Sequence, residues 1–348
     1  MKYEYLKAAP LREYSVKEGD APTEADRRVL AKDIPCQAAC PALTNVPLYI
    51  EHLARGDADA CYAVNLECNV FPGVLGRVCT RPCEERCRHQ WTNTRGPVTI
   101  CHLKRAGADK AARVEPPPAR FPATGKRVAI VGGGPAGLAA ARELRRFGHE
   151  VTLFERQPHL GGMMVDGIPR FRLPRDIVDK EIELITRTGI HVHLQTNVDA
   201  AKMRELADSH DAVCIAAGTM HVHMIDLPGI PADRLISGLA FMHHYNHGEI
   251  TALEGDVVVI GGGFTAVDCS RSSARAARRL LGEGGNISIY YRRTERFMAA
   301  NHDELEEIEH ENIVIRTLAT PIRGWMENGE VAGVTFQRNI LDPRSTEA

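Results

Sequence analysis

Cysteine is the residue whose placement in this chain most clearly suggests chemistry. Eight of the ten cysteines lie between residues 36 and 101, and only Cys214 and Cys269 stand elsewhere. The eight are Cys36, Cys40, Cys61, Cys68, Cys79, Cys83, Cys87 and Cys101. A disulfide framework needs an oxidising compartment and usually serves a small domain with no other way to fold, and the sequence indicates neither. The clustering therefore favours thiolate ligation of a metal ion or an iron–sulfur cluster.

Zinc is the competing occupant of such a site. Structural zinc sites typically use cysteines two to four residues apart in knuckles, and no Cys-x-x-Cys pair occurs in this chain. Pro41 follows Cys40, and three further cysteines recur one helical turn apart from Cys79 to Cys87, which is more typical of cluster ligation. Eight thiolates suffice for two four-cysteine sites, so we predict iron–sulfur clusters and keep zinc as the alternative.

A glycine-rich turn follows the cysteines and has the spacing Gly-x-Gly-x-x-Gly. It comprises Gly132, Gly133, Gly134, Pro135, Ala136 and Gly137. It lies between a buried-strand pattern at 127–131 and a helical pattern at 136–147. Such glycines permit a tight turn, close approach of a pyrophosphate and close helix–strand packing, with the helix N-terminus facing the phosphates. Glu155 ends the next strand pattern, where a carboxylate accepts hydrogen bonds from a ribose diol, so we predict a dinucleotide site.

The same order of strand, turn, helix and strand recurs at 256–291. This second turn carries Gly261, Gly263, Phe264, Thr265 and Ala266, with alanine in place of the third glycine. The following strand pattern ends with Arg292 and Arg293 instead of an acid. Because a guanidinium group matches phosphate geometry, this pair favours the 2′-phosphate of NADPH over NADH. The alternative is that both arginines are merely solvated side chains at the end of a strand.

These patterns divide the chain into five parts and predict an α/β fold. They are an N-terminal arm (1–32), an α-helical cysteine domain (33–115), a proline-rich linker (116–125), a first dinucleotide-binding domain (126–250) and a second (251–348). Helical patterns occupy 46–55 and 98–108 of the cysteine domain. We therefore expect a small helical domain followed by two Rossmann-like domains.

Composition and charge exclude several classes of function. Lysine plus arginine number 43 and aspartate plus glutamate 45, so no global field favours nucleic acid or an anionic membrane surface. No run of about eighteen apolar residues occurs, and the first twenty residues are charged throughout. We predict a soluble, cytoplasmic protein that binds neither nucleic acid nor membrane.

Other residues of chemically reactive types are expected to have structural roles only. Because no Cys-x-x-Cys pair is present, we expect Cys214 and Cys269 to be packed thiols that form no redox-active disulfide. The histidines lack a recurring carboxylate or cysteine partner and are expected at the surface; they are His191, His193, His221, His223, His243, His244 and His247. The acidic run 303–311 is expected to be a solvated helix face. No nucleophile or acid–base constellation is visible, so we predict no catalytic residue.

At these motifs the chain resembles the glutamate synthase small (β) subunit family, which shares its N-terminal domain with dihydropyrimidine dehydrogenase. The resemblance runs from about residue 33 to 340. It rests on the cysteines with Gly76-Arg77-Val78-Cys79, on Gly161-Gly162, on Gly167-Ile168-Pro169 with Phe171 to Pro174, on Ala216 to Thr219 and on the two arginines. It implies an iron–sulfur flavoprotein with two 4Fe-4S clusters, FAD and NAD(P)H.

The resemblance also assigns cluster ligands, with departures. Family ligands match Cys40, Cys79 and Cys83 for one cluster and Cys36 and Cys87 for the other. Two family cysteines just before the first of these are missing here, and Cys61 and Cys68 are candidate replacements. The family's non-cysteine ligand aligns with Lys104, a poor ligand, and Cys101 on the same helical face is the natural substitute. The implied sets are Cys36, Cys61, Cys68, Cys87 and Cys40, Cys79, Cys83, Cys101.

For the nucleotides, the resemblance implies contacts with residues of both predicted dinucleotide-binding domains and with one residue of the cysteine domain. FAD contacts map onto Val78, Gly132 to Gly137, Glu155, Gly162, Met163, Arg172 and Val198; plain packing is the alternative for Met163 and Val198. Nicotinamide dinucleotide contacts map onto Gly261, Gly263 to Ala266, Arg292 and Arg293. In the family, the chain returns to the FAD domain after the nucleotide domain and contacts the flavin through a Gly-Asp element. The present sequence ends before such an element. We therefore expect that the sequence is a fragment, that another subunit completes the flavin site, or that FAD binding is impaired.

The implied function is electron transfer between NAD(P)H, FAD and the clusters on behalf of a partner. Expected partners are the catalytic subunit of a redox complex and ferredoxin. The altered cysteines favour a module for a formate, aldehyde or ferredoxin-linked enzyme over a glutamate synthase small subunit. An alternative of another class is a zinc-binding or cofactor-poor assembly protein.

Overall fold

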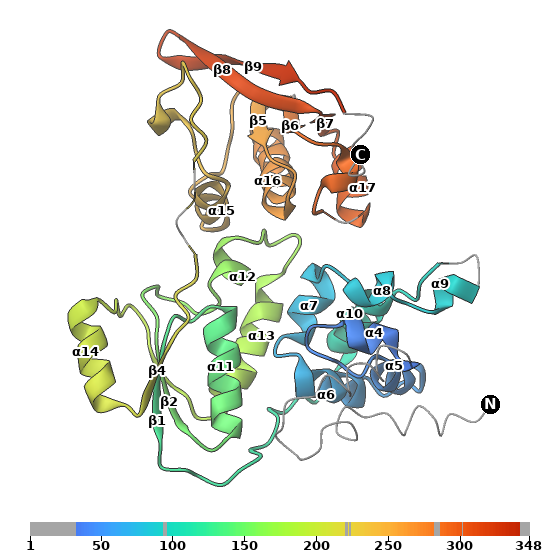
Figure 1. Cartoon of the computed structure of the whole chain (residues 1–348), viewed down its shortest axis with the longest axis vertical. Coiled ribbons are helices and arrows are strands. Elements are labelled where there is room, and N and C mark those ends of the chain that lie inside the picture. The colour runs from blue at the N-terminus through green and yellow to red at the C-terminus, as the bar shows by residue number, and fades with distance from the viewer. Residues whose placement is uncertain are drawn as a thin grey trace. The chain divides into compact units, whose positions relative to one another are not determined.

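A computed structural model describes residues 33–92, 96–219, 222, 224–281, 286–300 and 302–341. The described chain forms two compact units. The first contains the residues up to Gly161 together with Arg172–Ala217, and the second contains Gly162–Phe171 together with the residues from Gly218 onward. Figure 1 shows the elements of both units, which are described one at a time below. The predicted N-terminal arm, 1–32, lies outside the described residues.

The cysteine-rich part of the first unit is a set of short helices. They are α4 (Pro35–Ala39), α5 (Val46–Ala54), α6 (Ala58–Cys68), α7 (Pro72–Val78), α8 (Pro82–Glu85), α9 (His89–Thr92) and α10 (Ile100–Lys110). Asn45 and Asp57 cap α5 and α6 by accepting hydrogen bonds from backbone N–H groups of the first turn. The buried Tyr49 hydroxyl donates to the carbonyl of Ile100, so α5 and α10 share one core.

The rest of the first unit is a parallel sheet covered by helices. Its strands β1 (Arg127–Val131), β2 (Glu150–Phe154), β3 (His191–His193) and β4 (Ala212–Ile215) lie in the order β3-β2-β1-β4. Helices α11 (Pro135–Arg146) and α13 (Arg175–Thr186) lie on one face and α14 (Ala200–Ser209) on the other (Figure 1). Apolar strand residues such as Ile130 and Leu153 are fully buried, as expected for a parallel sheet covered on both faces.

The second unit contains another parallel sheet and a hairpin. Strands β5 (Val257–Ile260), β6 (Ile287–Tyr291) and β7 (Val314–Thr317) are parallel, and β8 (Ala319–Glu327) and β9 (Glu330–Arg338) are antiparallel. Helices α15 (Gly238–Asn246), α16 (Phe264–Leu281) and α17 (His302–His310) lie beside the parallel sheet (Figure 1). Short 3-10 turns occupy Ala232–Arg234 and Glu295–Phe297. The predicted α/β architecture, with two parallel sheets of dinucleotide-binding type, is confirmed.

The division into units differs from the predicted boundary at residue 250. Helix α15 packs against α16 through Phe241, Met242 and Cys269, so the segment before residue 250 joins the second unit. Residues 162–171, which contain α12 (Met163–Asp166), join it as well. Their attachment is specific, because the Asn246 amide donates to the carbonyls of Asp166 and Ile168.

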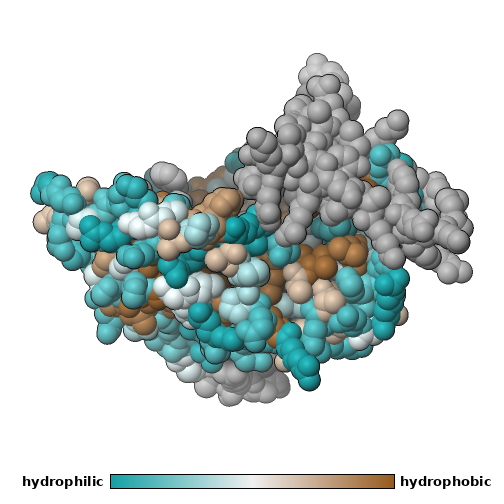
Figure 2. All heavy atoms as spheres, turned by 90° about the horizontal axis from the view of Figure 1, so that it is seen from below, coloured by the Kyte–Doolittle hydropathy of each residue, from teal (hydrophilic) through white to brown (hydrophobic). Residues whose placement is uncertain are grey.

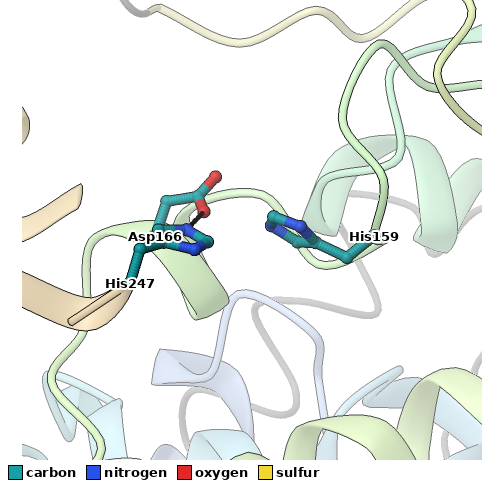
Figure 3. A group of neighbouring side chains, drawn as sticks. All are labelled: His159, Asp166 and His247. Carbon is teal, nitrogen blue, oxygen red and sulfur yellow. Dashed lines mark hydrogen bonds and ion pairs between the residues drawn. The ribbon is translucent and has the colours of Figure 1, made fainter. Parts of the chain in front are cut away.

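Histidines contribute to the same attachment. His247 Nε2 lies 2.9 Å from a carboxylate oxygen of Asp166, whose side chain is buried (Figure 3). His244 likewise pairs with Glu249. The expectation that these histidines have no carboxylate partner was therefore wrong for His243, which lies 3.7 Å from Asp166, and for His244 and His247. His191 and His193 are exposed as predicted. His221 and His223 lie outside the described residues.

The acidic run at 303–311 is more than the solvated face that was predicted. Glu304 and Glu311 pair with the buried guanidinium of Arg271 on α16, at 3.2 and 2.8 Å. Glu311 also accepts a hydrogen bond from Arg275, whose guanidinium lies over the ring of Phe171. The correction has a simple cause: Ile308 is buried against α16, which turns one acidic edge of α17 toward its arginines.

No helix in the described ranges is both long and apolar enough to cross a bilayer. The face drawn in Figure 2 mixes hydrophilic and hydrophobic residues, and the hydrophilic ones are the more frequent.

The ion pairs of Glu311 give the second unit a pH-dependent stability. Burial opposes ionisation, but hydrogen bonds from Arg275 and Arg271 outweigh it and hold the pKa of Glu311 below its usual 4.5. The contribution is therefore present above about pH 4.5 and is lost as the pH falls through the folded-state pKa. We expect Glu311→Gln to lower the free energy of unfolding by about 1–3 kcal/mol at pH 7.

Urea unfolding at pH 7 and pH 4 measures this effect. The difference from the parent protein should shrink at the lower pH, and the exposed Glu309→Gln should change little at either. Equal losses from both substitutions would contradict the assignment.

Candidate cofactor sites

Four thiols from four different elements line one cavity in the first unit. Cys40 and Cys79 follow the last residues of α4 and α7, Cys83 lies in α8 and Cys101 in α10. They are the same four cysteines that the sequence assigned to one cluster. All ten cysteines are free thiols, so no disulfide competes for them.

Hydrogen bonding and burial set the ionisation of these thiols. A hydrogen bond between Cys101 and Cys79 lowers the pKa of Cys79 to about 6 and raises that of Cys101. Burial raises the pKa of Cys83 to about 12. The cavity therefore favours the thiolate form of Cys79, and a bound cation or cluster would favour ionisation of Cys83 and Cys101 as well.

The spacing of the sulfurs argues against zinc. Four thiolates around zinc form a tetrahedron with edges of about 3.8 Å, given zinc–sulfur bonds of about 2.3 Å. Within the described residues, no set of three or more cysteines is gathered closely enough to hold a single metal ion. A 4Fe-4S core holds its four thiolates farther apart, because each sulfur binds a different iron. The residues of this cavity therefore fit an iron–sulfur cluster better than a single metal ion.

The other four cysteines are arranged differently. The Cys61 sulfur packs against Gly107 on α10, where an added Cβ would come within 2.4 Å of it. Burial raises the pKa of Cys36 to about 11, and the neighbouring Cys87 adds to this effect. Burial also raises the pKa of Cys68, and Glu67 adds to it. Cys61 thus has a packing role in this structure, and the grouping of these four residues around one cluster stays a prediction.

The first glycine-rich turn has the geometry that a dinucleotide site needs. Gly132 has a φ of 111°, and a Cβ on Gly137 would lie 1.9 Å from the Gly132 carbonyl oxygen, so larger residues are excluded. Gly134 caps α11, and Pro135 begins it. The Glu155 carboxylate accepts a hydrogen bond of 2.6 Å from the Gly133 N–H. The acid predicted to bind ribose is thereby fixed beside the turn.

The remaining predicted FAD contacts are divided between the two units. Val78 ends α7 in the first unit, which also contains Arg172. Val198 packs against the buried cluster of Ala129, Phe154 and Leu206, in agreement with the alternative of plain packing. Gly162 and Met163 belong to the second unit.

The second glycine-rich turn opens α16 and leaves room for a ligand. No atom lies within 4 Å of the position that a Gly263 Cβ would occupy, so a pyrophosphate can approach the backbone closely there. Gly261 has a φ of 148°, and Ala266 takes the place of the third glycine in the first turn of the helix. Phe264 and Thr265 are the first two residues of α16.

Arg292 and Arg293 follow β6 and are exposed. In the described part of the chain, neither guanidinium forms an ion pair with a carboxylate. Arg293 lies 5.9 Å from the ring centre of Phe297, which restrains it without neutralising it. Both side chains are therefore available to an anionic ligand.

One buried carboxylate joins the cysteine-rich helices to the first sheet. Glu181 on α13 accepts hydrogen bonds from the Tyr62 hydroxyl and from the backbone N–H groups of Gly73 and Val74, at 2.5, 2.5 and 3.0 Å. The N–H groups belong to the first turn of α7, whose last residue precedes Cys79. Burial raises the pKa of Glu181, and the three hydrogen bonds oppose that rise.

Sequence reasoning did not find Glu181. It stands in an ordinary amphipathic helical pattern, and its donors lie more than a hundred residues away along the chain. Arg142 escaped notice in the same way, although its buried guanidinium donates to the carbonyls of Leu66 and Asn69. A charged residue on the apolar face of its helix was the only available signal.

A helical domain with a four-thiol cavity, followed by two dinucleotide-type units, defines an iron–sulfur oxidoreductase of the flavoprotein class. Comparison with known families agrees. Residues 126–337 match the pyridine nucleotide-disulphide oxidoreductase family, and residues 9–115 match the 4Fe-4S domain II of dihydropyrimidine dehydrogenase. The chain belongs to this family of oxidoreductases and, within it, to the glutamate synthase small-chain group. The predicted family, the dependence on NAD(P)H, and the cofactors FAD and 4Fe-4S clusters are confirmed.

Two relatives and one solved structure illustrate the match. The chain is 36% identical over 337 residues to the NADP(+)-dependent formate dehydrogenase subunit beta of Moorella thermoacetica, covering 88% of this chain and 46% of that protein. It is 32% identical to the Escherichia coli K12 glutamate synthase (NADPH) small chain, covering 93% and 71%. FprA from Mycobacterium tuberculosis shares the fold with a TM-score of 0.55 at 20% identity, covering 64% of this chain and 66% of FprA. The chain thus spans less than half of the first relative.

The Glu181 junction predicts a large effect of one conservative substitution. Glu181→Gln keeps the size of the side chain but replaces one of the two accepting oxygens with an amide N–H₂ group. At least one buried backbone N–H, such as that of Val74, then loses its acceptor. We expect the free energy of unfolding to fall by about 2–3 kcal/mol. Chemical unfolding followed by circular dichroism measures it.

Glu183→Gln, on the exposed side of the same helix, is the matched control and should change stability by less than about 0.5 kcal/mol. A double-mutant cycle with Tyr62→Phe should show coupling. Additive losses would mean that the tyrosine and the carboxylate act independently.

Proposed function

We propose that the chain carries electrons between NADPH and a partner redox enzyme through FAD and two 4Fe-4S clusters. One observation carries the proposal: the four-thiol cavity and the FAD-type turn belong to the same compact unit, and Glu181 joins their elements. FAD and the clusters would supply the change between two-electron and one-electron transfer, which no side chain can provide.

Residues of the chain would hold these groups as follows. Cys40, Cys79, Cys83 and Cys101 would ligate one cluster, and Cys36 and Cys87, with Cys61 and Cys68 as further candidates, the other. The first glycine-rich turn would bind the FAD pyrophosphate, and Glu155, already oriented by the Gly133 N–H, its ribose. Val78, Arg172, Val198, Gly162 and Met163 are further candidate FAD contacts.

The second unit would bind the nicotinamide dinucleotide. Its phosphates would approach the open turn at Gly261 and Gly263, and residues 264–266 would present the N-terminus of α16 to them. The exposed Arg292 and Arg293 would bind the 2′-phosphate, which favours NADPH.

The partner would be the catalytic subunit of a redox complex, and ferredoxin is a second candidate. The names of the relatives, which are subunits of formate dehydrogenase and glutamate synthase, support the first. The thiols of the cavity are assigned to a cluster and no catalytic residue is predicted, so substrate chemistry would take place on that partner. Ten free thiols support a reducing, cytoplasmic location.

Anaerobic purification tests the function directly. The protein should contain flavin, iron and acid-labile sulfide, and NADPH should bleach its visible absorption. Cys79→Ser should remove about one cluster, or about four iron atoms per chain. Cys269→Ser should leave iron unchanged, because that thiol packs against the Gly238 carbonyl in the other unit. A colourless protein with zinc in place of iron would overturn the proposal and support an assembly role.

The arginine pair predicts nucleotide preference. Loss of a charge-assisted contact with the 2′-phosphate is worth about 1.5–3 kcal/mol, so Arg292→Ala or Arg293→Ala should raise the KM for NADPH about 10- to 100-fold. The KM for NADH should stay unchanged. Stopped-flow or steady-state reduction of the flavin with both nucleotides measures this.

Arg323→Ala, an exposed arginine on the hairpin strand β8, is the control. An equal loss for both nucleotides would contradict recognition of the 2′-phosphate by the arginine pair.

A further inference from the structure

Lys104 lies in the four-thiol cavity. It lines the cavity together with Cys40, Cys79, Cys83 and Cys101, and only 8% of its surface is exposed. It stands three residues after Cys101 on α10, so both side chains project from the same helical face.

The environment of Lys104 is unusual for a buried lysine. Among the described residues, its side chain makes neither an ion pair with a carboxylate nor a hydrogen bond. Burial of an ammonium group without a compensating charge is costly, and lysines are almost never buried unless paired. The groups that line the cavity with it and can become anionic are the four cysteine thiols and the Tyr49 hydroxyl, which donates to the Ile100 carbonyl. The nearby Glu84 carboxylate accepts a hydrogen bond from the Cys101 N–H and makes no ion pair with the lysine among the described residues. The charge of Lys104 is therefore balanced when these thiols are ionised, as they are in a cluster.

We propose that Lys104 is a positioning residue that sets the electrostatic potential of the cluster in this cavity and favours its reduced state. The inference rests on the proposed function, because it needs a cluster bound by these four cysteines. One electron added to a thiolate-bound cluster, supplied by the reduced flavin, makes the charge facing Lys104 one unit more negative. An ammonium group held within the cavity wall stabilises that extra charge, so the midpoint potential rises.

Direct ligation by Lys104 is the competing explanation of its position. An ammonium group has three donors and no lone pair, so it cannot bind iron while charged. Four thiols already occupy the cavity and suffice for the four irons of a cluster. The structure therefore assigns the lysine to charge balance and leaves ligation to the cysteines.

The test compares three variants of the full chain, purified anaerobically. Lys104→Met removes the charge and keeps the length of the side chain, Lys104→Arg keeps the charge, and Lys110→Met removes an exposed lysine from the same helix. Redox titration of each protein, followed by electron paramagnetic resonance of the reduced cluster, gives a midpoint potential that does not depend on cluster content or on partner activity.

We expect Lys104→Met to shift the midpoint of one cluster to a more negative potential, and Lys104→Arg and Lys110→Met to leave it near that of the parent. If Lys104→Met assembles no cluster while Lys104→Arg assembles it normally, the requirement for charge is likewise supported. A parent-like midpoint in Lys104→Met, or equal cluster loss in the Met and Arg variants, would overturn the inference. Absence of iron from the parent protein would instead overturn the proposed function on which it rests.

Discussion

The first unit depends on the burial of one carboxylate. Glu181 is 2% exposed, and its oxygens meet a tyrosine hydroxyl and two backbone N–H groups. Such a group destabilises the fold unless its partners are all in place, so the junction tolerates little displacement between α13 and α7. Helix α7 leads directly to Val78 and Cys79, so this contact helps to fix the cavity relative to the FAD-type turn, together with the hydrogen bonds from Arg142 to Leu66 and Asn69.

Local patterns predicted those parts of the molecule whose geometry is local. The strands beginning at Arg127 and Glu150, and the turn between them, follow from apolar runs and from glycines whose Cβ atoms would collide with backbone. The placement of α16 at Phe264–Leu281 likewise follows from a helical pattern after a glycine turn. In each case the residue type is dictated by neighbours close in sequence, so sequence suffices.

What the sequence could not predict depends on distant partners. The segment after Gly161 continues the first nucleotide motif along the chain, yet it belongs to the second unit, because Asn246 binds its carbonyls. The acidic run at 303–311 looked solvated for a similar reason: Arg271 lies more than thirty residues before the glutamates that it binds. The packing of the Cys61 sulfur against Gly107 was likewise not visible in the sequence, and the assignment of Cys61 as a cluster ligand stays a prediction.

Glu181 and Lys104 represent two different solutions to the burial of a charge, and the difference bears on function. The carboxylate is surrounded by donors that are fixed by the fold, so its environment is complete without any cofactor. The ammonium group shares its cavity with four thiols. Burial raises the pKa of Cys83, and the hydrogen bond with Cys79 raises that of Cys101, whereas the pKa of Cys79 is lowered to about 6. Ionisation of those thiols by iron would supply the missing negative charge. On the proposal made above, the lysine that was first judged a poor ligand would therefore favour binding of a cluster in this cavity.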